Sequence, residues 1–169
     1  MKNKVEMWIW IVVTSFLTLA VPSRAQSICP WLNAATAAGV LGGAPSVEVI
    51  NPGVSTGTCV FQLQNGATKD TLRVTVNRTE HPEDAGKALR SHELSCSVPG
   101  APLKGVGNEA LLCVSNTRTS RGELVVGRVR DNIFTVAISI GSGEDSESNR
   151  AALSEKAELI AKQVAGSLF

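Results

Sequence analysis

The chain has 169 residues, of which 43% are apolar, 18% are charged and only 4% are aromatic, and Tyr is absent. This length and composition are typical of one globular domain with a core of aliphatic side chains. Because the net charge is only +1 and aromatic side chains are few, the composition excludes the basic, base-stacking surface that nucleic-acid binding uses.

The N-terminus has the pattern of a secretory signal peptide. Lys2 and Lys4 precede an apolar and hydroxyl-containing run over 7–21, and Ser23 and Ala25 supply the small residues of a cleavage site. A transmembrane anchor is the alternative, but this run is shorter than the ~20 apolar residues that a membrane span needs. We therefore predict a signal peptide over residues 1–25 and a periplasmic or secreted protein.

Cleavage after residue 25 would remove three basic residues and one acidic residue, which changes the formal net charge from +1 to −1. A lipid anchor on Cys29 is disfavoured, because Gln26 and Ile28 do not supply the apolar and small residues expected three positions and one position before such a cysteine. We expect no stable membrane span after cleavage, and one domain over residues 26–169.

Four cysteines lie in the predicted mature domain: Cys29, Cys59, Cys96 and Cys113. An even number in an exported domain indicates two disulfides, although four cysteines allow three pairings. We favour Cys29 with Cys59, which would tie the N-terminal helix to a strand, and Cys96 with Cys113, which would close a Pro/Gly-rich loop. A reactive or metal-binding thiol is the alternative, but no local motif provides the low-pKa setting that it needs.

The first half of the mature domain predicts one short helix and three strands. Pro30 suits the first turn of this helix, small and apolar residues recur at helical spacing from Leu32 to Val40, and Gly42-Gly43 would end it. The strands are expected over 46–51, 58–64 and 71–79, and Asn65-Gly66 is the predicted hairpin turn between the last two. The third strand alternates apolar and polar residues, so one of its faces should be buried and the other exposed to water.

The second half predicts the same order of elements. Pro82 opens a helix whose Ala85, Ala88, Leu89 and His92 share one face, and an irregular loop follows over 99–107. The three strands are expected over 110–115, 123–130 and 133–140, with a turn at Asp131-Asn132. A final helix is expected to begin at Asn149, after a polar loop over 141–148.

The element order is therefore helix, three strands, helix, three strands, helix. Strands that are joined by hairpins and separated by helices predict an α+β fold, in which helices pack on an antiparallel sheet. No linker is long enough to divide residues 26–169, so we expect a single domain.

Three segments carry a resemblance to known proteins. They are Cys29-Pro-Trp-Leu-Asn with the small residues up to Gly42, Cys59-Val-Phe61, and Gly105-Val-Gly-Asn-Glu-Ala110 with the strand-turn-strand over 127–136. Together they resemble small exported bacterial domains of unknown function, including lipoproteins and the extracellular sensor-like domains of receptor kinases. The resemblance implies a PsbP-like sandwich of sheet and helices, and it brings no catalytic residues.

Catalytic and metal-binding motifs are disfavoured. His81 and His92 are the only imidazoles, and their spacing does not match the i, i+4 pattern of helical zinc ligands. Glu83-Asp84 and the acidic stretch 144–147 lie at expected helix starts, where negative charge stabilises a helix. Gly105 and Gly107 precede a strand, so no helix N-terminus would face a phosphate there. We predict no enzyme activity, no metal and no cofactor.

Candidate binding residues are four arginines around the last hairpin: Arg118, Arg121, Arg128 and Arg130. Together with the loop over 98–108 they would form a binding surface, since loops held on a rigid sheet often carry binding residues. We expect an exported, non-enzymatic binding or sensor-like domain of the bacterial cell envelope, whose partner is an envelope protein or a small ligand. The alternative is an inhibitor or accessory protein of an envelope enzyme, acting through a projecting loop between Cys96 and Cys113. The scarcity of Trp and Tyr disfavours an aromatic platform for carbohydrate.

Overall fold

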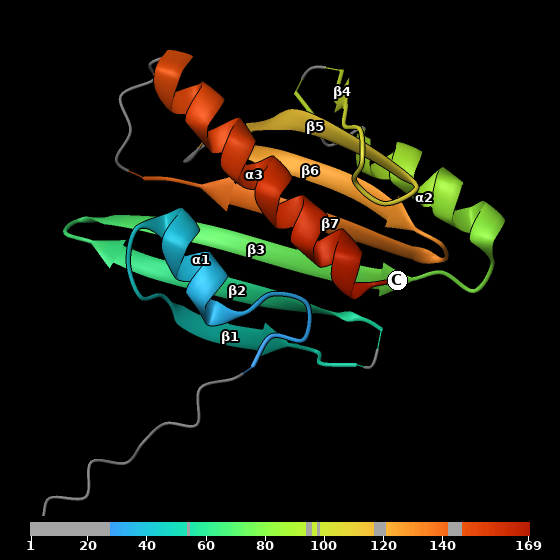
Figure 1. The fold of residues 1–169 in the computed structure, drawn as a ribbon, viewed down its shortest axis with the longest axis horizontal. Helices are drawn as coiled ribbons and strands as arrows, with labels where there is room; N and C mark the ends of the chain where they lie inside the picture. The colour runs from blue at the N-terminus through green and yellow to red at the C-terminus, as the bar shows by residue number, and fades with distance from the viewer. Residues whose placement is uncertain (1–27, 54, 94–95, 98, 117–120, 142–146) are drawn as a thin grey trace, which may run out of the picture.

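The structure is a computed structural model that describes residues 28–53, 55–93, 96–97, 99–116, 121–141 and 147–169. The predicted signal peptide over 1–25 lies outside these residues. In the described part of the chain, three helices pack on one seven-stranded antiparallel sheet, which confirms the predicted α+β class (Figure 1).

The strands follow the order β1-β2-β3-β7-β6-β5-β4 across the sheet. The pairing of β3 with β7 joins the N-terminal half of the sheet to its C-terminal half. In chain order the elements are α1 (Ala34–Leu41), β1 (Ser46–Ile50), β2 (Gly57–Asn65), β3 (Thr68–Arg78), α2 (Pro82–Glu93), β4 (Ala101–Pro102), β5 (Glu109–Asn116), β6 (Arg121–Val129), β7 (Asn132–Ser139) and α3 (Glu147–Ser167).

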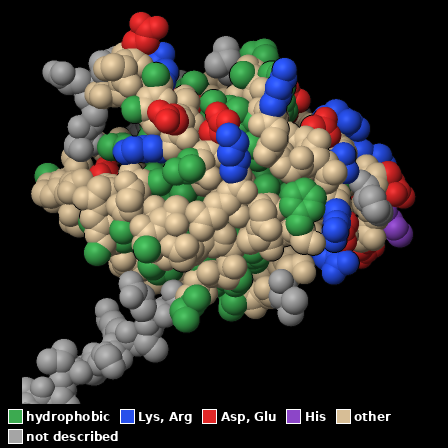
Figure 2. All heavy atoms as spheres, in the orientation of Figure 1, with side chains coloured by type: hydrophobic (Ala, Val, Ile, Leu, Met, Phe, Trp, Pro, Cys, Tyr) green, Lys and Arg blue, Asp and Glu red, His purple; other side chains and the backbone are tan. Residues whose placement is uncertain are grey.

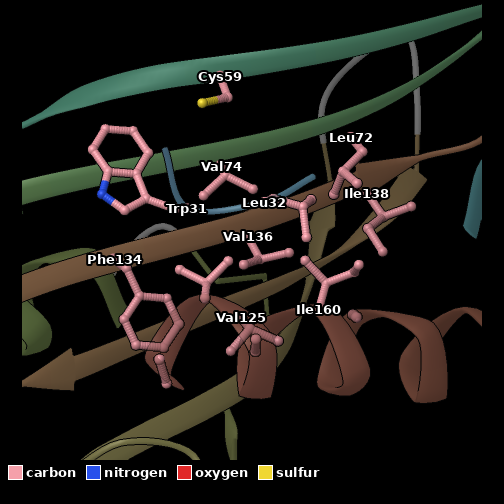
Figure 3. Close-up of a cluster of buried hydrophobic side chains, with 14 of the residues drawn as sticks. Trp31, Leu32, Cys59, Leu72, Val74, Val125, Phe134, Val136, Ile138 and Ile160 are labelled. Atoms are coloured by element: carbon pink, nitrogen blue, oxygen red, sulfur yellow. The ribbon is translucent and has the colours of Figure 1, made fainter. Parts of the chain in front are cut away.

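Helices α1 and α3 lie on one face of the sheet, where α1 contacts β2 and β3 and α3 contacts β6 and β7 (Figure 1). The main core fills the space beneath them, and Figure 3 shows Leu72, Val136 and Ile160 among its side chains. Helix α2 packs on the opposite face, because its Ala85 and Leu89 contact Val126 and Ile133, which alternate with core residues along β6 and β7. The sheet thus carries two helices on one face and one helix over part of the other.

Both disulfides have the favoured pairing, Cys29 with Cys59 and Cys96 with Cys113. The first attaches the segment before α1 to β2, and the second attaches the segment after α2 to β5. Because the Cys29 sulfur is bonded to Cys59, it is not available for lipid attachment. The sequence separations are 30 and 17 residues, for which the chain-entropy model gives about 3–4 kcal/mol of stabilisation each, slightly more for the longer loop.

The first predicted hairpin turn lies one residue later than expected, and the second lies one residue earlier. Asn65 pairs with Thr68, so the first loop is Gly66-Ala67, whereas Val129 pairs with Asn132, so the second loop is Arg130-Asp131. The first loop residue has a positive φ in each case, 59° at Gly66 and 56° at Arg130. The prediction for the second loop was wrong because Arg130, and not Asp131 or Asn132, takes the left-handed conformation.

The expected irregular loop over 99–107 contains a short strand that was not predicted. Ala101 and Pro102 form β4, which pairs with Leu112 and Leu111 at the edge of the sheet. Two residues are too few to show the alternation by which a strand is recognised in a sequence. Val106, further along the same segment, is 1% exposed and belongs to the main core.

Candidate functional site

The four candidate arginines do not form one cluster. Arg121 begins β6, Arg128 lies near its end and Arg130 lies in the turn that follows. Nine residues of extended chain separate Arg121 from Arg130, which corresponds to about 30 Å. Arg118 lies outside the described residues. The structure therefore brings together only Arg128 and Arg130.

Arg128 is held by its neighbours in the sheet. Its Nε lies 3.7 Å from Oε2 of Glu109 on β5, and its Nη1 donates to the backbone carbonyl of Arg130 at 3.4 Å. The Nε atom is buried and lacks a hydrogen-bond partner. Although their spacing of two residues would place Arg128 and Arg130 on one face of a continuous strand, Arg130 leaves the strand in the turn. The Arg128 side chain therefore contacts Glu109 and the turn, and only part of it is exposed to solvent.

Arg130 is fixed by its backbone while its side chain stays exposed. The Arg130 N–H donates to Oδ1 of Asn108 at 2.7 Å, and the Asn108 N–H donates to the carbonyl of Arg128 at 2.8 Å. A non-glycine residue with φ of 56° is uncommon and stores strain, which the two hydrogen bonds offset. Residues 107–108 of the preceding loop thus contact the end of β6 and the turn after it.

Gly107 allows this close approach. A Cβ atom at Gly107 would lie 2.5 Å from the carbonyl oxygen of Arg128, and its φ of 63° is also unfavourable for other residues. The loop can therefore press against the hairpin only with glycine at this position. Gly107 therefore has a structural role that needs no phosphate ligand.

Phe169 completes the candidate site. The residue is 63% exposed, and the guanidinium carbon of Arg130 lies 5.9 Å from the ring centroid, within the range of a cation–π contact. No periodic pattern in the sequence connects these two residues, so their contact could not be predicted. We call Asn108, Arg128, Arg130 and Phe169 the Arg130–Phe169 surface.

An ion pair borders this surface. Arg78 Nε at the end of β3 lies 2.6 Å from Oδ2 of Asp131, and this contact lowers the pKa of the Asp131 carboxyl below 3.8. Figure 2 shows Lys and Arg side chains gathered at this end of the molecule, next to the C-terminal end of α3, with Asp and Glu side chains among them. The charge there is mixed, and it does not form a uniform basic patch.

The two histidines do not form a site. His81 precedes α2 and His92 lies in its last turn, so about 16 Å of helix separates them. In the ranges that the structure describes, no group of three His, Cys, Asp or Glu side chains is arranged to hold a metal ion.

Two buried carboxylates were not singled out in the sequence. Asp70 is 3% exposed and accepts hydrogen bonds from Asn65 Nδ2 and the Gly141 N–H at 2.7 and 2.9 Å. Glu123 is 4% exposed on β6, where burial raises the pKa of its carboxyl while a Ser154 hydrogen bond and the Arg150 charge oppose this. Period-two alternation would have found both, because each lies two residues before a core residue of its strand.

Comparison with known proteins identifies no relative: no family model, no curated protein and no solved structure matches the chain. Among the described residues, no helix is long and apolar enough to cross a membrane. Two disulfides are typical of proteins from oxidising compartments outside the cytosol.

Proposed function

We propose that this protein is an exported, non-enzymatic binding domain of the bacterial cell envelope and that it binds a protein partner through the Arg130–Phe169 surface. The observation that carries the proposal is the contact between an exposed Arg side chain and an exposed Phe ring on a fixed turn. Arg and aromatic residues are enriched among the residues that contribute most to protein–protein binding. The proposed partner is an envelope protein that presents a carboxylate and an apolar group side by side.

Rigidity of the turn supports this proposal. Asn108 and the carbonyl of Arg128 hold the backbone on both sides of Arg130, and the hairpin loop has only two residues. A binding residue whose backbone is already ordered loses less conformational entropy when a partner binds. The left-handed conformation of Arg130 fits the same interpretation, because strained residues gather at binding and catalytic sites.

The alternative function, an inhibitor or accessory protein of an envelope enzyme, depended on a projecting loop between Cys96 and Cys113. In the described part of that segment, β4 pairs with β5 and Val106 lies in the core. The segment therefore follows the sheet, and no observation favours the alternative.

Affinity capture tests the proposal. The purified protein is immobilised, envelope proteins from its host are passed over it, and the affinity of the retained partner is then measured for the Arg130→Ala, Phe169→Ala and double variants. Arg90→Ala, an exposed arginine on α2, is the matched control.

We expect each single variant to lower the affinity at least fivefold, which corresponds to the ~1 kcal/mol that marks a residue important for binding. The double variant should lose less than the product of the two single losses, because the two side chains contact each other. Affinities that equal that of Arg90→Ala, or no retained partner, would contradict the proposal.

A further inference from the structure

The face of the sheet opposite α1 and α3 carries a second, separate array of polar side chains. On β3, exposed or half-buried Lys69, Thr71, Arg73 and Thr75 alternate with core residues and so point to this opposite face. The same alternation places residues of β1, β2 and β7 beside them. We call the array the hydroxyl face; it consists of Ser46, Thr58, Gln62, Thr71, Arg73, Thr75, Thr135 and Ser139, and the charged residues Glu48 and Lys69 lie on the same face.

Strand register arranges the hydroxyl groups in two rows. Thr58, Thr75 and Thr135 are paired across β2, β3 and β7, and Oγ1 of Thr58 lies 3.0 Å from Oγ1 of Thr75. Neighbouring strands are about 4.8 Å apart, so hydroxyl groups recur at about this interval along the row. The second row crosses the same strands at Gln62, Thr71 and Ser139.

Arg73 lies between the two rows. Its paired neighbours are Val60 on β2 and Ala137 on β7, neither of which carries a charge. Among the described residues, neither Arg73 nor Lys69 on the same face has an ion-pair partner, whereas Arg78 and Arg128 each have one. The face thus presents two cationic groups without an ion-pair partner among the described residues, and one carboxylate, Glu48, two strands away from Arg73 in the same row.

The fold leaves this face accessible over β1 to β3. Helix α2 contacts β6 and β7, and the segment that Cys96 attaches to Cys113 lies over β5. Arg73 is exposed, and the hydroxyl-bearing residues around it are half-buried, as expected for short side chains on a flat sheet. Ile50, an exposed large apolar residue, lies at the rim, where it pairs with Thr58.

We propose that the hydroxyl face binds an acidic polysaccharide. The Arg73 guanidinium matches the geometry of a uronate carboxylate, with which it can form two parallel hydrogen bonds. Hydroxyl and amide side chains both donate and accept hydrogen bonds, as sugar hydroxyls do, so the two rows can exchange water for the hydroxyls of neighbouring sugar residues. Binding would depend on hydrogen bonds and charge, with no aromatic stacking.

A protein partner fits this face less well. Ser and Lys are depleted in protein–protein interfaces, and the large apolar or aromatic anchors that dominate their affinity are missing between the two described rows. The hydroxyl face and the Arg130–Phe169 surface centre on different residues, Arg73 and Arg130, so the two proposals concern different ligands and are tested by different variants.

The test uses three polymers that separate charge from sugar chemistry. Polygalacturonate carries carboxylates and sugar hydroxyls, polyglutamate carries the carboxylates alone, and dextran carries the hydroxyls alone. Binding of the purified protein to each is measured by isothermal titration calorimetry and by retardation in gels that contain the polymer. We expect polygalacturonate to bind at least tenfold more tightly than either of the others.

Variants locate the binding site. Arg73→Gln should lower the affinity for polygalacturonate at least tenfold, and Arg73→Lys should retain part of it because the charge remains. Thr75→Val and Thr135→Val remove hydroxyl groups at constant shape, and each should lower the affinity by about three- to tenfold, as the loss of one ~1 kcal/mol hydrogen bond predicts. Lys162→Gln, on α3 and the opposite face, is the matched loss of charge and should have no effect.

Circular dichroism and thermal unfolding confirm that each variant is folded. The proposal is overturned if polygalacturonate does not bind, if polyglutamate binds equally well, or if Arg73→Gln and Lys162→Gln have equal affinities. Tighter binding of single-stranded DNA than of polygalacturonate would also overturn it, since this would identify a general polyanion surface.

Discussion

Lys156 on α3 donates from Nζ to the backbone carbonyl oxygen of Val40 in the last turn of α1, at 3.0 Å. The last carbonyls of a helix have no partner within the helix, and a cation there also interacts favourably with the helix dipole. Lys156 therefore satisfies one of the end carbonyls of α1, whose C-cap is Gly42, and joins the two helices that cover the same face of the sheet.

Replacing Lys156 by Met should destabilise the protein. Met keeps most of the apolar stem and removes the partly buried charged hydrogen bond, so we expect a loss of about 1–2 kcal/mol in the free energy of unfolding. Urea unfolding followed by circular dichroism measures the change. The control is Lys162→Met, which removes an exposed pair with Glu158 worth about 0.3–0.5 kcal/mol. Equal effects of the two variants would show that the link to Val40 contributes nothing.

Glu123 should make stability depend on pH. Burial raises the pKa of its carboxyl above 4.5 in the folded protein, so the folded state binds this proton more strongly than the unfolded state. The stabilisation is fully present below pH 4.5 and is lost as the pH rises through the folded pKa. Glu123→Gln should remove this dependence and become more stable relative to the native protein between pH 4.5 and 7.

Thermal unfolding across this pH range measures the difference between Glu123→Gln and the native protein. Glu155→Gln, at an exposed position on α3, controls for the change in net charge. A difference that stays constant from pH 4.5 to 7 would show that the folded protein does not raise this pKa.

Asp131 should make stability depend on pH in the opposite direction to Glu123. Its contact with Arg78 lowers the pKa of the carboxyl below 3.8 in the folded state, so the stabilisation is present above that value and is lost as the pH falls through the folded pKa. Asp131→Asn should therefore be less stable than the native protein at pH 6 and approach it in acid. Because the pair is on the surface, high salt should weaken the effect. Unfolding at pH 2 to 6 in low and high salt tests this, and a pH-independent difference would contradict it.

Gly127 should not tolerate a larger side chain. A Cβ atom there would overlap the Phe134 ring, so Gly127→Ala should cost about 1–3 kcal/mol through overpacking. Gly166→Ala is the contrasting change, since nothing lies within 4 Å of its added Cβ and alanine is favoured over glycine in a helix by about 1 kcal/mol. Chemical denaturation compares them. Combining Gly127→Ala with Phe134→Leu should recover part of the loss, and strict additivity would exclude the ring as its cause.

Local patterns predicted most of the fold. The alternation along β3, the helical spacing in α3 and the hairpin signals were enough to predict the order of elements and the α+β class, and the favoured disulfides were confirmed. What failed depended on contacts between segments. The turn after β6 was misplaced because Asn108, from another loop, holds Arg130 in a conformation that is uncommon for arginine.

The candidate site was less predictable. Arginines close in the sequence were expected to lie close in space. An extended strand rises about 3.3 Å per residue, however, so Arg121 and Arg130 lie far apart along β6 and its turn. Phe169 contacts Arg130 only because α3 packs across the sheet. Register across three strands also determined which hydroxyl groups lie together, and one strand read alone does not contain that information.

The two disulfides lie on opposite sides of the β3–β7 pairing, one within the N-terminal half of the chain and one within the C-terminal half. A chain that emerges from a membrane with its N-terminus first would expose its cysteines in the order in which they pair. Cys29 and Cys59 could therefore be joined before Cys96 appears, and no exchange of partners would be needed later. The two halves would meet as separately cross-linked units, held together by the β3–β7 hydrogen bonds, the shared core and side-chain contacts such as Lys156 with Val40 and Arg78 with Asp131.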